Sequence, residues 1–131
     1  MPKFGRKSME HLTECHPDIQ RVLLEVVKTF DCSVIEGHRP DAEQDKLYHA
    51  GKSKAKAGQS KHNHLPSLAV DVVPYPIDWG DRDRFHYFAG FVMATAQSMD
   101  VDLRWGGDWD KDWQTRDNSF DDLPHFELRE A

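Results

Sequence analysis

Residues 60–74 read SKHNHLPSLAVDVVP, and their second half, LAVDVVP at 68–74, is the strongest strand signal in the chain. Apolar side chains occupy most of these positions, which is typical of a strand buried in a sheet. Asp71 interrupts the apolar run. A carboxylate is costly to bury unless it is paired or bound to a cation, so the segment predicts a partner for Asp71.

The segments on either side alternate between helical and extended patterns. Residues 16–30 and 81–100 carry apolar side chains at helical spacing, and 40–51 is expected to form a shorter helix ending near Gly51. Short strands are expected at 32–37, 101–106 and 125–128, with long loops at 52–66 and from 106 to about 123. This pattern predicts an α+β domain with helices packed on a small, mainly antiparallel sheet.

Composition limits the classes of protein to consider. The 131 residues are 38% hydrophobic and 31% charged, which suits a soluble chain with a real core, and we predict a single domain over 1–131. A formal net charge of −6 argues against nucleic-acid binding, because phosphate contacts need a basic face. One basic loop, with five lysines between Lys46 and Lys61, is either simply solvated or attracts an anionic polymer such as a cell-wall glycan.

The N-terminal segment 1–12 lacks the apolar stretch of a signal peptide, and no run approaches the ~18 apolar residues of a membrane span. We therefore expect synthesis in the cytoplasm and no membrane insertion. Cys15 and Cys32 can form a disulfide, but a chain of this length does not need one. A monomer is the simplest expectation.

Three segments carry residues that can bind a metal. His62 and His64 precede Asp71, and His125 opens the last expected strand. Two histidines and one carboxylate from separate segments form the ligand set of a catalytic zinc site, with the fourth position left to water. Asp122 lies three residues before His125, so a tight turn can hold its carboxylate beside that water as a general base.

A plainer interpretation fits the same residues. With eight histidines in the chain, pairs arise by chance. Asp71 can cap a neighbouring turn, and His125 can be a hydrogen-bonded core residue. Composition and spacing alone do not choose between this interpretation and a zinc site.

Several motifs, in order along the chain, resemble those of the VanY-like zinc metallopeptidases. SKHNHLPSLAVDV at 60–72 is similar to the family's Ser-x-His…Ala-x-Asp signature, and DDLPHFEL at 121–128 to its second signature, an acid three residues before a histidine. IEGHRPDAEQDKLY at 35–48 resembles the upstream segment, in which an arginine follows a glycine. VVPYPIDW at 72–79 and LRWGGDW at 103–109 resemble segments of the phage branch. The combination is specific, although each motif alone is weak.

The resemblance implies roles for individual residues. Zinc would be bound by a histidine of the first motif, Asp71 and His125, with Asp122 as the general base and acid. Arg39 would hold a substrate carboxylate or the developing oxyanion, and Ser60 would contact the substrate backbone. An alternative for Arg39 is a surface ion pair with Asp41 or Glu43.

Two histidines compete for the first zinc position. The Ser-x-His context selects His62, which lies nine positions before Asp71. The family's commonest spacing of seven positions selects His64. Pro66 and Ser67 favour a turn that loops out two residues, so we favour His62 and place His64 beside the cleft or behind the ligands.

The resemblance implies a peptidase of bacterial peptidoglycan, most simply a phage endolysin that cuts the L-Ala–D-Glu bond after release through the inner membrane. The alternatives are a D-Ala-D-Ala carboxypeptidase and a non-catalytic, zinc-containing module that binds the cell wall. Asp122 speaks against the latter, because a binding module needs no general base.

An acidic and aromatic loop near the C-terminal end is interpreted as a wall of the cleft, with its tryptophans mostly packed. Its carboxylates can also bind calcium, although their spacing lacks the EF-hand pattern. The residues concerned are Trp105, Trp109 and Trp113 with Asp108, Asp110 and Asp112.

Overall fold

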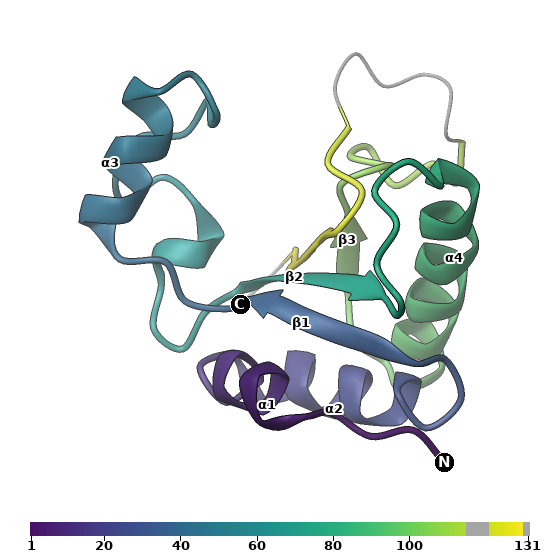
Figure 1. Cartoon of the computed structure of the whole chain (residues 1–131). Helices are drawn as coiled ribbons and strands as arrows, with labels where there is room; N and C mark the ends of the chain where they lie inside the picture. The colour runs from purple at the N-terminus through teal and green to yellow at the C-terminus, as the bar shows by residue number, and fades with distance from the viewer. Residues whose placement is uncertain (115–120, 130–131) are drawn as a thin grey trace.

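Figure 1 shows the computed structural model, which describes residues 1–114 and 121–129. The four strands in this part of the chain form one antiparallel sheet in the order β1-β2-β4-β3. The predicted α+β architecture is confirmed. The elements are α1 (Arg6–Leu12), α2 (Pro17–Val26), β1 (Cys32–Glu36), α3 (Asp41–His49), the 3₁₀ helix η1 (Lys61–Asn63), β2 (Ala69–Pro74), α4 (Arg82–Ser98), β3 (Leu103–Trp105) and β4 (His125–Leu128).

A single cluster of buried apolar side chains joins α1, α2 and α4 to the sheet. Helices α2 and α4 contact each other, and α4 also contacts β2 and β3. Phe88 of α4 packs edge-on against Phe126 of β4, and both are almost fully buried. Burying each such side chain contributes roughly 1.5–3 kcal/mol. Cys15 and Cys32 are buried free thiols.

Helix α1 is an element that the sequence did not predict. It has only seven residues, and its apolar side chains are too few to produce a helical period. The helix is held by tertiary contacts, because it packs on β1 and the Ser8 hydroxyl accepts a hydrogen bond from the Val34 amide at 3.0 Å. Helix α2 is shorter than expected and ends at Val26.

The sheet carries a row of polar side chains on one face. Side chains alternate along a strand, so Asp71 points away from the buried Val70 and Val72. Asp71 is paired directly with His125 on β4 and with Glu36 on β1. Residues opposite each other in an antiparallel sheet share a face. Three strands therefore present polar groups at one place.

Helix α3 and the segment that follows it stand apart from the sheet on one side of this row (Figure 1). The chain returns to the sheet through η1, whose N-cap is Ser60. No helix in the described ranges is long and apolar enough to cross a membrane.

Candidate active site

A cleft of about 360 Å³ lies between the α3 segment and the sheet. His62, Asp122 and His125 line it on one side, and Lys52 and Lys54 line it on the other. Another hollow of about 390 Å³, between α4 and β3, contains none of the predicted site residues. The first cleft is therefore the candidate active site.

Three predicted ligands come together beside this cleft. Nε2 of His62, Nδ1 of His125 and Oδ1 of Asp71 lie 3.2 Å from one another. Two ligands at the usual distance from a tetrahedral zinc ion are roughly 3.3 Å apart. The three atoms thus have the spacing of one face of a zinc tetrahedron.

The outward-facing nitrogen of each imidazole has its own hydrogen-bond acceptor. Nδ1 of His62 donates to the carbonyl oxygen of Gly37 at 2.7 Å, and Nε2 of His125 donates to Oε1 of Glu127 at 2.8 Å. Each ring then turns a lone pair toward Asp71. Lone pairs and a carboxylate at this separation repel unless positive charge lies among them, so the donor set fits a zinc ion.

Without a metal, a proton supplies that positive charge. Burial lowers the pKa of His125, but its hydrogen bonds to Asp71 and Glu127 outweigh burial and raise that pKa to about 9. Burial raises the pKa of Asp71, yet hydrogen bonds from His125 and His62 hold it well below its usual value. The charges and spacing of the cluster therefore suit a bound cation.

Asp122 is positioned by a tight turn, as its spacing from His125 predicts. The His125 amide donates to the Asp122 carbonyl at 3.1 Å. Gly106 ties the turn to β3: its carbonyl accepts from the Asp122 amide, and its amide donates to the His125 carbonyl, both at 2.8 Å. Burial and the charge of Asp71 raise the pKa of Asp122. A carboxylate with a raised pKa is a better proton acceptor.

Arg39 lines the cleft, but its ion pair differs from the alternative considered above. Its guanidinium makes a bidentate pair with Glu36, at 2.9 and 2.6 Å, rather than pairing with Asp41 or Glu43. Nη1 also donates to the side-chain oxygen of Gln44 at 2.8 Å. These bonds use three of its five N–H groups and fix its plane, which leaves two N–H groups to bind an anion.

Ser60 and His64 take different positions near the ligands. Ser60 lines the cleft, and its hydroxyl caps η1 by accepting from the His62 amide at 3.2 Å. This cap orients the buried His62 toward Asp71. His64 is exposed just after η1 and is not part of the three-ligand cluster. The geometry supports His62 rather than His64 as the first ligand.

The acidic and aromatic loop is only partly a cleft wall. Trp109 lines the cleft and Trp105 is buried, whereas Trp113 is 57% exposed and is an exception to the expected packing of the tryptophans. The carboxylates of Asp108, Asp110 and Asp112 lie within 4.8 Å of one another. The two carboxylate oxygens of Asp108 accept hydrogen bonds from the backbone amides of residues 112 and 113. Calcium binding there stays a prediction.

Glu127 is a site residue that the sequence analysis missed. It holds His125, and it accepts a charge-assisted hydrogen bond from Arg104 at 2.7 Å. Burial raises the pKa of Glu127, but the hydrogen bonds from His125 and Arg104 lower it to about 2. The alternation in HFEL places residues 125 and 127 on one face and would have indicated this pair.

Comparison with known proteins adds a second kind of observation. The family model described as phage L-alanyl-D-glutamate peptidase matches residues 1–129. The chain belongs to this peptidase family. The match covers nearly the whole sequence, and it agrees with the resemblance to VanY-like enzymes.

Two similar proteins come from bacteria. The peptidoglycan L-alanyl-D-glutamate endopeptidase CwlK of Bacillus subtilis is 28% identical over an aligned span of 114 residues, and the match covers 77% of this chain and 62% of CwlK. The chain thus spans less than two thirds of that relative. The crystal structure of the Serratia marcescens L-Ala D-Glu endopeptidase ChiX matches with a TM-score of 0.75 and 32% identity, covering 97% of this chain and 90% of ChiX.

Proposed function

We propose that this member of the family is a zinc-dependent peptidase that hydrolyses the L-Ala–D-Glu bond of bacterial peptidoglycan stem peptides. The observation that carries the proposal is the three-ligand cluster of His62, Asp71 and His125 opening on a cleft that Asp122 also lines. The L-Ala–D-Glu endopeptidase activities for which CwlK and ChiX are named support the choice of bond.

In this proposal His62, Asp71 and His125 hold the zinc ion, which polarises the scissile carbonyl and acidifies water when bound. Asp122 accepts a proton from the attacking water and passes it to the amine of the departing D-Glu as the C–N bond breaks. The two remaining N–H groups of Arg39 stabilise the developing oxyanion or bind a substrate carboxylate.

The basic side of the cleft suits such a substrate. Lys52, Lys54 and Arg39 line it, while the chain as a whole carries a net charge of −6. The stem peptide is anionic on the D-Glu side of the scissile bond. A local cationic wall on an acidic protein therefore favours binding of that side in the cleft.

The lytic role in phage release, with the protein made in the host cytoplasm and acting as a monomer in one domain, belongs to the same proposal. The alternatives remain removal of a terminal D-Ala and zinc-containing wall binding without catalysis. Products separate all three: cleavage after L-Ala frees the amine of D-Glu, carboxypeptidase action frees alanine, and a binding module frees neither.

Asp122→Asn tests the proposed base, because the amide keeps the side chain's size but cannot accept the proton. We expect purified peptidoglycan to be digested at least 100-fold more slowly, with zinc content and thermal unfolding unchanged. The measurement is release of free D-Glu amines, with fragments assigned by mass spectrometry.

Asp83→Asn, an exposed carboxylate in the first turn of α4, is the matched control and should digest at the normal rate. Undiminished hydrolysis by Asp122→Asn would contradict the mechanism. Fragments that have lost only a terminal alanine would identify the carboxypeptidase instead.

A further inference from the structure

A second cavity borders Asp122 outside the basic cleft. It has a volume of about 160 Å³, and we call it the Trp79 pocket. Asp122, the proposed general base, is a lining residue of both cavities. Trp79, Arg82, Phe85 and Asp121 also line the Trp79 pocket.

Trp79 forms a supported aromatic surface in this pocket. Its ring stacks on the buried Phe85, with centroids 5.5 Å apart and planes 22° from parallel. The side chain is nevertheless 59% exposed. One face of the indole is thus held by the core while much of the ring remains open to a ligand. An exposed tryptophan alone means little, but here it lines a cavity beside the site.

The rim of the pocket carries planar polar groups. Nη2 of Arg82 donates to Oδ2 of Asp121 at 2.6 Å, and both side chains are partly exposed. Arginine offers further N–H donors, and the carboxylate offers further lone pairs. An aromatic surface flanked by such donors and acceptors matches a sugar ring, whose C–H face packs on the indole while its hydroxyl and acetamido groups bind the rim.

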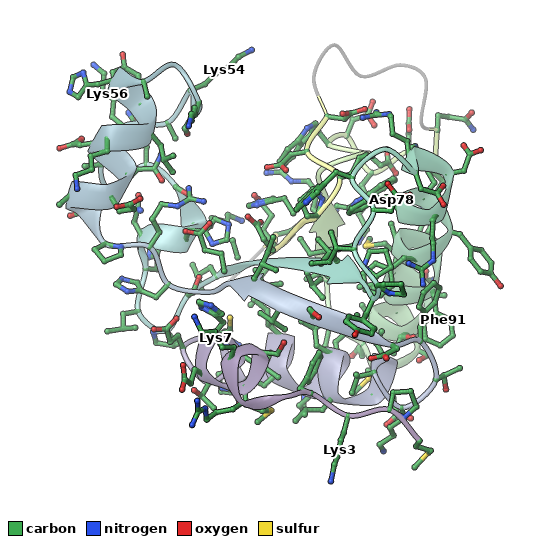
Figure 2. The ribbon with its side chains drawn as sticks, viewed as in Figure 1. Lys3, Lys7, Lys54, Lys56, Asp78 and Phe91 are labelled. Carbon is green, nitrogen blue, oxygen red and sulfur yellow. The ribbon has the colours of Figure 1, made fainter. Side chains whose placement is uncertain are left out.

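Charge assigns the two cavities to different parts of the substrate. The stem peptide is anionic beyond D-Glu, whereas the amino side of L-Ala is joined through a lactyl amide to an N-acetylated sugar and carries no free carboxylate. The lysines lie in the α3 segment, and the Trp79 pocket lies beyond the end of β2. Figure 2 labels Lys54 beside the α3 segment and Asp78, in the loop just before Trp79, on the side of α4.

We propose that the Trp79 pocket is a subsite for the N-acetylated sugar attached to L-Ala of the stem peptide. The inference rests on the proposed function, because it takes the scissile bond to lie at Asp122. The sugar stacks on Trp79 and hydrogen-bonds to Arg82 and Asp121, while the D-Glu side of the peptide occupies the basic cleft.

Two substrates that differ only in the sugar test this assignment. One is a soluble stem peptide bearing its disaccharide, and the other is the same peptide with a simple N-acetyl group on L-Ala. We expect the normal protein to have a higher kcat/KM for the sugar-bearing substrate. Trp79→Ala should lower that kcat/KM about tenfold, which is the scale of one stacking contact, and leave the sugar-free peptide unaffected.

Further variants separate stacking from general damage. Trp79→Phe keeps an aromatic ring and should retain most of the preference for the sugar. Arg82→Ala removes a rim donor at an exposed position and should reduce the same preference selectively. Tyr87→Ala is the control, because Tyr87 is an aromatic side chain on α4 that is 75% exposed and lines neither cavity. It should cleave both substrates normally.

The subsite is overturned if the normal protein cleaves both substrates equally well. It is also overturned if the folded Trp79→Ala variant slows both substrates alike or neither. Those results leave the proposed function standing, since the L-Ala–D-Glu bond is still cut. Failure of the normal protein to cut this bond in either substrate would instead remove the proposed function, and the subsite with it.

Discussion

His62 shows how the position of a single side chain favours one of two ligands that residue counting left open. Spacing selects His64, but the structure buries His62 beside Asp71 and leaves His64 exposed. The deciding contacts are local, because Ser60 caps η1 and the Gly37 carbonyl receives the outward nitrogen of His62. Only glycine fits at position 37, because a Cβ there would lie 2.3 Å from the His11 carbonyl oxygen.

Removing each histidine in turn tests this assignment. We expect His62→Ala to lose zinc affinity by more than about 100-fold, because a ligand disappears, while His64→Ala binds zinc normally. Metal content after gel filtration, together with competition against a chelator, measures both. Loss of zinc only from His64→Ala would show that the ligand assignment is wrong.

The backbone at the end of β3 holds the turn that carries Asp122 and His125 in place. Gly106 hydrogen-bonds to Asp122 on one side and to His125 on the other. A Cβ at Gly106 would lie 2.1 Å from the Asp122 carbonyl oxygen, so the strand and the turn approach as closely as backbones can. The element that carries the proposed base and one proposed ligand is therefore positioned by a glycine.

Gly106→Ala must push this turn away from β3. We expect a loss of about 1–3 kcal/mol in the free energy of unfolding and a larger loss of hydrolysis than that destabilisation explains. Urea unfolding and digestion of peptidoglycan measure the two effects. Gly90→Ala is the matched control, because a Cβ at this exposed position of α4 meets no atom within 4 Å. This variant should gain up to about 1 kcal/mol in the free energy of unfolding and should remain active. Equal behaviour of the two variants would contradict the role of Gly106.

Three charged side chains are linked within the interior of the described part of the molecule. Most of the interior is a cluster of apolar side chains, but Asp71, His125 and Glu127 form a hydrogen-bonded chain across β2 and β4. The proton on His125 compensates the two carboxylates when no metal is bound. The stability of the metal-free protein should then depend on pH through His125.

The sign of that dependence follows from the raised pKa of His125. Its contribution to stability is fully present below the ordinary pKa of 6.5 and is lost as the pH rises through about 9. We expect the metal-free protein to lose on the order of 3 kcal/mol over this range. Added zinc should stabilise the protein more at the upper end, because the metal replaces the proton. Urea unfolding of both forms at the two limits tests this; a metal-free stability that does not fall would contradict it.

The two long helices and the strand around Asp71 could be predicted from the sequence. The buried face of a helix and that of a strand each require their own spacing of apolar residues. Helix α2, helix α4 and strand β2 follow from such patterns, as does the choice of Asp71, which interrupts an apolar run, as a candidate residue. The short helix α1 leaves no such pattern, since its contacts with β1 hold it in place.

The sequence by itself determined the fold class and the chemical types at the site, because those depend on periodicity and on which side chains can bind a cation. Only the tertiary structure placed His62 rather than His64 beside Asp71, paired Arg39 with Glu36, and brought Glu127 behind His125. Those contacts join residues whose side-chain directions depend on turns, caps and strand register. Spacing along the chain carries no information about direction, and direction decides which atoms meet.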